Sequence, residues 1–469
     1  MKIEQIYTGC LAQGAYYITS NGEAAIIDPL REVAPYLKRA EEDGVKIKYI
    51  FETHFHADFV SGHVTLAEKT GAKIVFGPSA VTGFDAHIAK DEEIFKIGDI
   101  KIKALHTPGH TMESTTYLLI DENDKDHAIF SGDTLFLGDV GRPDLAQKSN
   151  EVTQEELAGT LFDSLRNKIM PLADDVTVYP AHGAGSACGK NMMKETVDSL
   201  GNQKQMNYAL RADMTKEEFI AEVIDGLLPP PAYFPLNVQM NKEGYESIDS
   251  VLESGLQALN PQDFETIATE IGALMLDVRK TTDFTAAHVP NSIFIGLDGG
   301  FAPWVGELIV DVNQPIILIV NEGREEEAVT RLARVGFDHT LGFLKGGVEA
   351  WKAAGKEVES LESIPATEFA ERFEGVKDVV FDVRKPGEFT SEHIDGAHLA
   401  TLADLNKHLN DFPEDKDFYV HCAGGYRSVI ASSILKSRGI HNIVEVQGGY
   451  GAIKLTNIPR TDYVCPSTL

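Results

Sequence analysis

Short apolar runs alternate with helix-like patterns along the first half of the chain. Runs of Val, Ile, Leu, Phe and Tyr bounded by turn residues are typical of buried β-strands, and here they are EAAIIDP, KIKYIFETH, AKIVFG, IKIKALHTPGH, TTYLLID, HAIFSGD and DVTVYPAH. EVAPYLKRAEEDG and QEELAGTLFDSLRNKIM have helical spacing, and Gly44 closes the first of them. The alternation predicts an α/β fold.

The pattern becomes helical over residues 191–228 and then meets a proline-rich stretch, LLPPPAYFPLN. Because Pro229, Pro230 and Pro231 cannot continue a helix, the helical segment ends there. We therefore expect a first domain over residues 1–240, which includes these helices and the proline-rich linker.

The second half of the chain contains an internal repeat. LMLDVRKTTDFTAAHVPNS aligns with VVFDVRKPGEFTSEHIDGA, and LKGGVEAW aligns with VQGGYGAI further on. The matched positions are Asp277 and Asp382, His288 and His393, and Gly346 and Gly448. Landmarks at nearly constant spacing predict two copies of one α/β domain, over residues 255–357 and 360–469.

The composition argues against several classes of protein. Asp and Glu number 72 against 42 Lys and Arg, and the net charge of −30 would repel nucleic acid and anionic membrane surfaces. No apolar run approaches the ~18 residues that span a bilayer, and the N-terminal segment lacks the features of a secretory signal. The four cysteines are far apart, which favours a reducing cytoplasm over a disulfide scaffold.

Four of the predicted strands are followed directly by histidine or aspartate. These residues are His54, His56, Asp58, His110, Asp133 and His182. If the strands share a sheet edge and a direction, their loops converge on one site. Converging imidazoles and carboxylates are what a divalent transition metal requires.

The motifs THFHAD, TPGHT, GDTLF and PAHG, in this order, resemble the metallo-β-lactamase fold. The resemblance covers roughly residues 1–240 and implies an αββα sandwich. Members with two metals usually read H-x-H-x-D-H in the first motif, whereas this chain places Phe59 at the last histidine. The substitution removes one imidazole from the second site and argues against a dinuclear zinc centre.

Within that superfamily the chain most resembles the persulfide dioxygenases. This resemblance implies one Fe(II) per chain, held by His54, His110 and Asp133. Two histidines and one carboxylate leave open positions on iron for O2 and a persulfide. The remaining residues of the cluster, which would orient the ligands or bonded water, are His56, Asp58 and His182. A mononuclear zinc hydrolase is also compatible with Phe59.

Two residues outside the cluster are candidates for contact with substrate. The family resemblance implies that Arg142 meets the carboxylate of a thiol such as glutathione, and a guanidinium fork suits a carboxylate. Cys188 follows His182 closely in AHGAGSACGK. It is a possible persulfide carrier near the metal, with a packed small residue as the equal alternative.

A second chemical feature lies in FYVHCAGGYRS, where a strand ends at Cys422 and a helix follows. The sulfur loop continues through Ala423, Gly424, Gly425, Tyr426 and Arg427. Backbone N–H groups, the helix N-terminus and Arg427 all favour a thiolate. With DVRKPGEF upstream, the stretch resembles a rhodanese domain, and the loop length matches the sulfurtransferase form. This implies that Cys422 carries sulfane sulfur.

The first copy of the repeat lacks this chemistry. It reads VNEGREEEA in the corresponding place, with Asn321 instead of the cysteine and glutamates over 325–327. Negative side chains there would repel a thiolate or sulfite. We expect this copy to be catalytically inactive and structural.

The whole chain resembles bacterial persulfide dioxygenase–sulfurtransferase fusions. The resemblance implies oxidation of a low-molecular-weight thiol persulfide by O2 to sulfite, followed by sulfur transfer to sulfite that yields thiosulfate, a route of sulfide detoxification. It also implies a homo-oligomer. The alternatives are a zinc-dependent thioester hydrolase like glyoxalase II and a non-enzymatic sulfur carrier or sensor. The identity of the thiol stays open.

Overall fold

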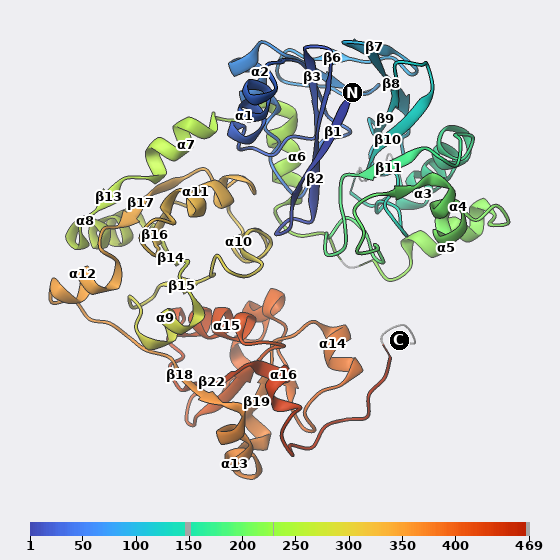
Figure 1. Ribbon diagram of the computed structural model, residues 1–469. Helices are drawn as coiled ribbons and strands as arrows, with labels where there is room; N and C mark the ends of the chain where they lie inside the picture. Colours follow the sequence, from blue (N-terminus) through green and yellow to red (C-terminus); the bar gives the residue numbers. More distant parts are fainter. Residues whose placement is uncertain (146–151, 228, 466–469) are drawn as a thin grey trace. The chain divides into compact units, whose positions relative to one another are not determined.

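The computed structural model describes residues 1–145, 152–227 and 229–465 (Figure 1). The chain divides into two compact units. Their bounds are Met1–Ser250 with Leu332–Phe337, and Val251–Arg331 with Asp338–Leu469. No helix within the described ranges has the length and apolar character needed to cross a bilayer.

The first unit contains two six-stranded sheets. The first sheet, in order, is β1 (Lys2–Thr8), β2 (Gln13–Ser20), β3 (Glu23–Ile27), β4 (Lys46–Phe51), β5 (Lys73–Phe76) and β6 (His87–Ile88). The second, in order, is β12 (Asp198–Ser199), β11 (Thr177–Pro180), β10 (Asp126–Gly132), β9 (Thr115–Ile120), β8 (Ile100–His106) and β7 (Ile94–Ile97). Its helices are α1 (Ala34–Asp43), α2 (His63–Thr70), α3 (Gln154–Ser164), α4 (Leu200–Met206), α5 (Lys216–Ile224) and α6 (Phe234–Glu243).

The two sheets pack face to face around an apolar core. Phe51 of the first sheet meets Tyr117 of the second, and Tyr16 meets Phe130, with ring centroids 4.8 and 4.9 Å apart. A separate apolar cluster joins the first sheet to α1 and α2, and another joins the second sheet to α3 and α5. The order helix, sheet, sheet, helix confirms the predicted sandwich.

Local signals set the helix ends. Gly44 ends α1 in the left-handed conformation at φ 63°, as its position in the sequence predicts. Thr153 and Glu156 form a capping box at the start of α3. Each apolar run predicted in the first half forms a strand, and the strands outside the predicted set are β1, β2, β6, β7 and β12.

The strands that precede the candidate ligands belong to different sheets. β4 lies in the first sheet, and β8, β10 and β11 lie in the second. The condition that the four strands share one sheet edge is therefore not met. The loops meet because the sheets face each other, and a hydrogen bond from the Thr115 N–H to the Thr53 carbonyl, at 2.8 Å, joins them there.

The second unit repeats one parallel five-stranded sheet. The first copy, in order, is β13 (Ala258–Leu259), β17 (Thr340–Leu344), β16 (Ile316–Ile319), β14 (Leu274–Asp277) and β15 (Ile293–Phe294); the second is β18 (Glu362–Pro365), β22 (Ile443–Gln447), β21 (Phe418–His421), β19 (Val380–Asp382) and β20 (His398–Leu399). The helices of this half are α7 (Ile248–Gly255), α8 (Pro261–Thr266), α9 (Thr281–Ala286), α10 (Phe301–Leu308), α11 (Glu325–Ala333), α12 (Gly347–Ala353), α13 (Ala366–Val376), α14 (Pro386–Ser391), α15 (Tyr426–Ser437) and α16 (Gly449–Ile453). The identical strand order confirms the internal repeat.

The strand register corrects one detail of the repeat. Asp277 pairs with Ile319 in the first copy, and Asp382 pairs with His421 in the second. The next residue along each strand is therefore Val320 in the first copy and Cys422 in the second. Val320, rather than Asn321, stands in the place of the cysteine, and the first copy still offers no thiol.

Gly132 lets the two sheets approach each other beside Asp133. Its φ is +54°, and a Cβ there would lie 2.6 Å from the Cβ of Thr53.

Gly22 also has a positive φ, +80°, but a Cβ there would meet no atom within 4 Å. We predict that Gly22→Ala lowers the free energy of unfolding by about 1 kcal/mol through backbone strain. Gly132→Ala should cost about 1–3 kcal/mol more through the collision. Urea unfolding measures both, and equal losses would contradict this account.

Candidate metal centre and sulfur site

Three residues from three loops form the core of the candidate metal centre. His54 follows β4, His110 follows β8 and Asp133 follows β10, and each is at most 2% exposed. Asp133 Oδ2 lies 3.9 Å from His54 Nε2 and 3.5 Å from His110 Nε2. One ligand atom from each residue lies within 4.8 Å of the others. The arrangement brings two imidazoles and one carboxylate to a single point.

Hydrogen bonds fix the tautomers of the two histidines. His54 Nδ1 lies 3.0 Å from Thr53 Oγ1, which itself donates to Asp28, so Nδ1 carries the proton. His110 Nδ1 lies 2.8 Å from the carbonyl oxygen of Arg142 and donates to it. The Nε2 lone pairs of both rings are thus left for a metal.

The environment favours a cation between these groups. Both carboxylate oxygens of Asp133 are buried and accept no hydrogen bond. A buried carboxylate without a partner is strongly destabilising, so the residues fit a bound metal ion. Burial, reinforced by the neighbouring imidazoles, lowers the pKa of His54 well below its usual range. A neutral imidazole is the form that coordinates metal.

A second group lies beside the first, but one of its members is engaged elsewhere. His56, Asp58 and His182 also bring ligand atoms within 4.8 Å of one another. His56 Nε2, however, lies 3.0 Å from Asp28 Oδ1 and 3.4 Å from Glu52 Oε2. Burial alone would lower the pKa of His56, but these two carboxylates raise it well above its usual range. A protonated imidazole cannot bind a metal.

Phe59 occupies the space beside His56. It is fully buried, and its ring stacks on the His56 imidazole with centroids 4.3 Å apart and planes at 29°. The phenyl ring thus adds packing where a further imidazole would add a ligand.

Two acidic residues around His56 were not among the residues singled out from the sequence. Asp28 follows β3, and Glu52 follows β4. Glu52 also accepts from Ser61 and lies 3.1 Å from His63 Nδ1, which gives His63 a buried partner. Their position directly after apolar strands was the available signal, since the same signal marks Asp133.

Cys188 and Arg142 lie close to the metal centre. A ligand atom of Cys188 falls within 4.8 Å of those of Asp133 and His182. Burial, with the charges of Asp58 and Asp133, raises the pKa of the Cys188 thiol well above its usual range. Arg142 is 5% exposed, and its Nε and Nη2 donate to Asp144 at 2.6 and 2.7 Å. A substrate carboxylate at Arg142 would therefore compete with Asp144.

The sulfur loop lies between β21 and α15. Cys422 is 1% exposed, and its Sγ accepts a hydrogen bond from the Gly425 N–H at 3.1 Å. Gly425 has φ +98° and stands directly before α15, so the helix N-terminus faces the sulfur. Arg427 forms a bidentate ion pair with Glu388 at 2.7 and 2.8 Å. The Gly425 N–H and the N-terminus of α15 therefore stabilise negative charge on the sulfur directly. The charge of Arg427 is partly neutralised by its ion pair with Glu388.

Comparison with known proteins identifies the parts of the chain. The model of the metallo-beta-lactamase superfamily matches residues 8–182, and the rhodanese-like domain model matches residues 260–354 and 365–456. The mitochondrial persulfide dioxygenase ETHE1 of Mus musculus is 31% identical over 47% of this chain and 78% of its own length. The chain belongs to the metallo-β-lactamase superfamily. It is a fusion of a metallo-β-lactamase domain with two rhodanese-like domains.

Other members of the superfamily show how far the likeness extends. A metallo-beta-lactamase of Staphylococcus aureus superposes with a TM-score of 0.66 at 32% identity, over 73% of this chain and 99% of that one. A probable hydroxyacylglutathione hydrolase of Schizosaccharomyces pombe is 32% identical over 34% of this chain, and the match spans 59% of its length. The superfamily thus supports a metal-dependent enzyme, and its members differ in reaction.

Metal content distinguishes the two groups of candidate ligands, which are His54, His110 and Asp133 in one and His56, Asp58 and His182 in the other. We predict that the wild-type protein binds one metal ion per chain and that His110→Ala loses it, because two of three ligands cannot hold it tightly. His182→Ala is the matched control, since His182 Nε2 is equally buried and lies 3.6 Å from Asp133 Oδ1. It should keep most of the metal. Elemental analysis after anaerobic loading with Fe(II), and separately with Zn(II), measures both variants. Two ions per wild-type chain, or equal loss in both variants, would contradict the assignment.

Proposed function

We propose that the metallo-β-lactamase domain is an iron-dependent persulfide dioxygenase and that the second rhodanese domain is a sulfurtransferase. A low-molecular-weight thiol persulfide, O2 and one water molecule would give sulfite, the free thiol and two protons, with the third sulfite oxygen coming from water. Cys422 would then transfer persulfide sulfur to sulfite to give thiosulfate. The observation that supports the metal part most is the Asp133 carboxylate, which accepts no hydrogen bond, beside the imidazoles of His54 and His110, while His56 is engaged by Asp28 and Glu52.

The residues of the centre suit one iron with open positions. Fe(II) bound by His54, His110 and Asp133 would supply the electrons that allow O2 to react with a persulfide. Thr53 and the Arg142 carbonyl orient the two imidazoles. Phe59 and His56 close the side where a second metal would sit. Arg142 and Cys188 stay candidates for contact with the thiol.

The transfer at Cys422 is balanced in atoms and electrons. The Cys422 thiolate attacks the outer sulfur of a persulfide R–S–SH, a new S–S bond forms, and the thiolate RS⁻ leaves. Sulfite then attacks the outer sulfur of Cys422–S–SH through its own sulfur lone pair, which yields thiosulfate and regenerates the Cys422 thiolate. The Gly425 N–H and the N-terminus of α15 stabilise the thiolate at both ends of the cycle.

A zinc-dependent thioesterase is the second candidate. Hydroxyacylglutathione hydrolases match this chain at identities similar to that of ETHE1, and the one named GloC from Haemophilus influenzae is 30% identical over 94% of its length. A zinc-bound hydroxide performs such hydrolysis near neutral pH. The rhodanese-like domains favour sulfur chemistry instead.

Oxygen uptake tests the dioxygenase. We predict that protein loaded anaerobically with Fe(II) consumes O2 when glutathione persulfide is added and that His110→Ala reduces the rate at least 100-fold, because it removes an iron ligand. An oxygen electrode measures the rate, with S-lactoylglutathione hydrolysis by the Zn(II)-loaded protein measured in parallel. Thioester hydrolysis without O2 uptake from glutathione persulfide, coenzyme A persulfide or polysulfide would replace the dioxygenase by the hydrolase.

Product analysis tests the sulfurtransferase. We predict that Cys422→Ser abolishes enzymatic thiosulfate formation and lets sulfite accumulate, while O2 uptake continues, because the two sites are separate. Cys465→Ser makes the same change at an exposed cysteine and should leave the products as in the wild type. Ion chromatography of sulfite and thiosulfate distinguishes the variants. Thiosulfate formation by Cys422→Ser at the wild-type rate would refute the role of Cys422.

A further inference from the structure

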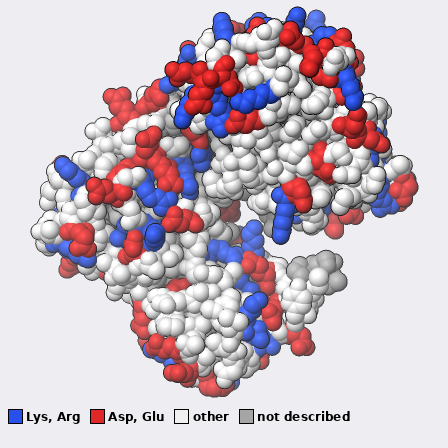
Figure 2. Space-filling view, in the orientation of Figure 1, with Lys and Arg blue, Asp and Glu red and all other residues white. Residues whose placement is uncertain are grey.

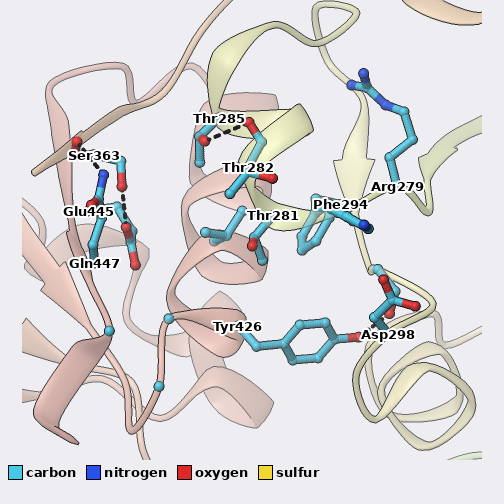
Figure 3. A pocket seen from close by; sticks show the side chains of 16 residues that line it. Arg279, Thr281, Thr282, Thr285, Phe294, Asp298, Ser363, Tyr426, Glu445 and Gln447 are labelled. Carbon is cyan, nitrogen blue, oxygen red and sulfur yellow. Dashed lines mark hydrogen bonds between the residues drawn. The ribbon is translucent and has the colours of Figure 1, made fainter. Parts of the chain in front are cut away.

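A cavity of about 530 Å³ lies between the two rhodanese repeats (Figure 3). Both repeats belong to the second compact unit of the chain. The inactive repeat lines the cavity with Thr281, Thr282 and Thr285 of α9, and the active repeat lines it with Gly424, Gly425 and Tyr426. The inactive repeat therefore forms a wall next to the sulfur loop.

Direct hydrogen bonds hold this wall in place. The Tyr426 hydroxyl donates to the carbonyl oxygen of Gly296 at 2.7 Å, from the first residue of α15 to the inactive repeat. The Phe294 N–H donates to Ser433 Oγ at 2.9 Å. Phe294 and Tyr426 both line the cavity, so the same residues that join the repeats also shape it.

The cavity adjoins the loop that holds the reactive sulfur. Gly425, whose N–H donates to Cys422 Sγ, is part of its lining. Ser428 Oγ lies 3.5 Å from the same sulfur and donates to Glu445 Oε1 at 2.7 Å. Glu445 lines the cavity as well, so Gly425 separates the sulfur from the cavity on one route, and Ser428 and Glu445 separate them on the other.

The volume exceeds what an inorganic sulfur anion needs. Sulfite and thiosulfate have only a few heavy atoms, whereas pockets of roughly 300–1,000 Å³ hold organic ligands. The cavity of about 530 Å³ falls within that range. Its size therefore suits an organic thiol bound next to Cys422.

The lining combines apolar surface with several hydroxyl and amide groups and carries little positive charge. Besides the threonines, it includes Ser363 and Gln447 (Figure 3). Among the described basic residues of the lining, Arg279 is bound to Asp277 at 2.6 Å, and Lys280 is exposed. Two acids, Asp298 and Glu445, also face the cavity. Such a lining matches the amide groups of a peptide-like thiol, offers Lys280 to its carboxylate, and disfavours the several phosphates of coenzyme A.

We propose that this cavity binds a peptide-like, low-molecular-weight thiol that exchanges sulfane sulfur with Cys422, and that the inactive repeat determines which thiol is used. The inference rests on the proposed sulfurtransferase. In the exchange, the thiolate RS⁻ attacks the outer sulfur of Cys422–S–SH. A new S–S bond forms and gives R–S–SH, the S–S bond to the Cys422 sulfur breaks, and Cys422 leaves as the thiolate. Thr285 and Lys280 are specificity residues and take no part in bond making.

A single-turnover experiment on the full-length chain tests this proposal. Cys422 is loaded with sulfur from thiosulfate, excess thiosulfate is removed, and unloading by glutathione, coenzyme A or cyanide is followed by mass spectrometry. Thr285→Phe fills the cavity. Thr390→Phe is the matched control, because Thr390 occupies the equivalent place in α14 and, like Thr285, donates to a backbone carbonyl of its own helix. Lys280→Glu is a second variant on an exposed side chain.

We expect glutathione to unload the wild-type protein with a saturable rate and at least tenfold better, at equal concentration, than coenzyme A. The second-order rate for glutathione relative to that for cyanide should fall at least tenfold in Thr285→Phe and several-fold in Lys280→Glu. In Thr390→Phe it should stay at the wild-type value. Unchanged ratios in both cavity variants, or equal use of coenzyme A, would overturn the proposal while leaving the sulfurtransferase intact. Failure of the wild type to load would overturn the sulfurtransferase, and the proposal with it.

Discussion

The buried carboxylate of Asp133 is the constraint on which the metal centre depends. Neither of its oxygens accepts a hydrogen bond, and imidazole nitrogens of His54, His110 and His182 lie 3.5–3.9 Å away. An isolated buried charge of this kind is tolerated only when a cation compensates it. The fold brings the residues together by packing two sheets face to face, with Gly132 as the point of close approach.

The surroundings of His56 explain how one metal site is kept distinct from its neighbour. Asp28 and Glu52 hold this imidazole from one side, and Phe59 stacks on it. In the group of His54, His110 and Asp133 the ligand atoms are free to bind a candidate metal, whereas in the neighbouring group His56 is already paired with Asp28 and Glu52. Phe59 is consistent with an intact site for a single metal, which is the condition that the proposed oxygen chemistry requires.

Strand periodicity predicted the α/β organisation, the aligned landmarks predicted the repeat, and the residues that follow each strand marked the candidate metal ligands. The sandwich was implied by the resemblance of the motifs to the metallo-β-lactamase fold. These patterns did not reveal that His54 reaches the site from a different sheet than His110, because pairing between sheets leaves no local pattern. Asp28 and Glu52 escaped notice because their significance depends on what faces them across the core. The ion pair of Arg427 with Glu388 was not predicted for the same reason, because it depends on which side chains face each other in the fold. The strand register makes Val320, rather than Asn321, the position equivalent to Cys422, because a comparison of letters alone does not fix which residues pair across the sheet.

Both rhodanese-like repeats line one cavity, and under the proposed function the second would carry the sulfur on Cys422 while the first forms a wall of that cavity. Acidic side chains are spread over the visible surface of the chain (Figure 2). The account as a whole depends on a single metal at His54, His110 and Asp133. An anomalous difference map, recorded at the iron edge on anaerobically loaded crystals, tests this most directly. The account predicts one peak bonded to these three residues. A second peak at His56, Asp58 and His182, or a single peak bonded to His182 and Cys188, would contradict it.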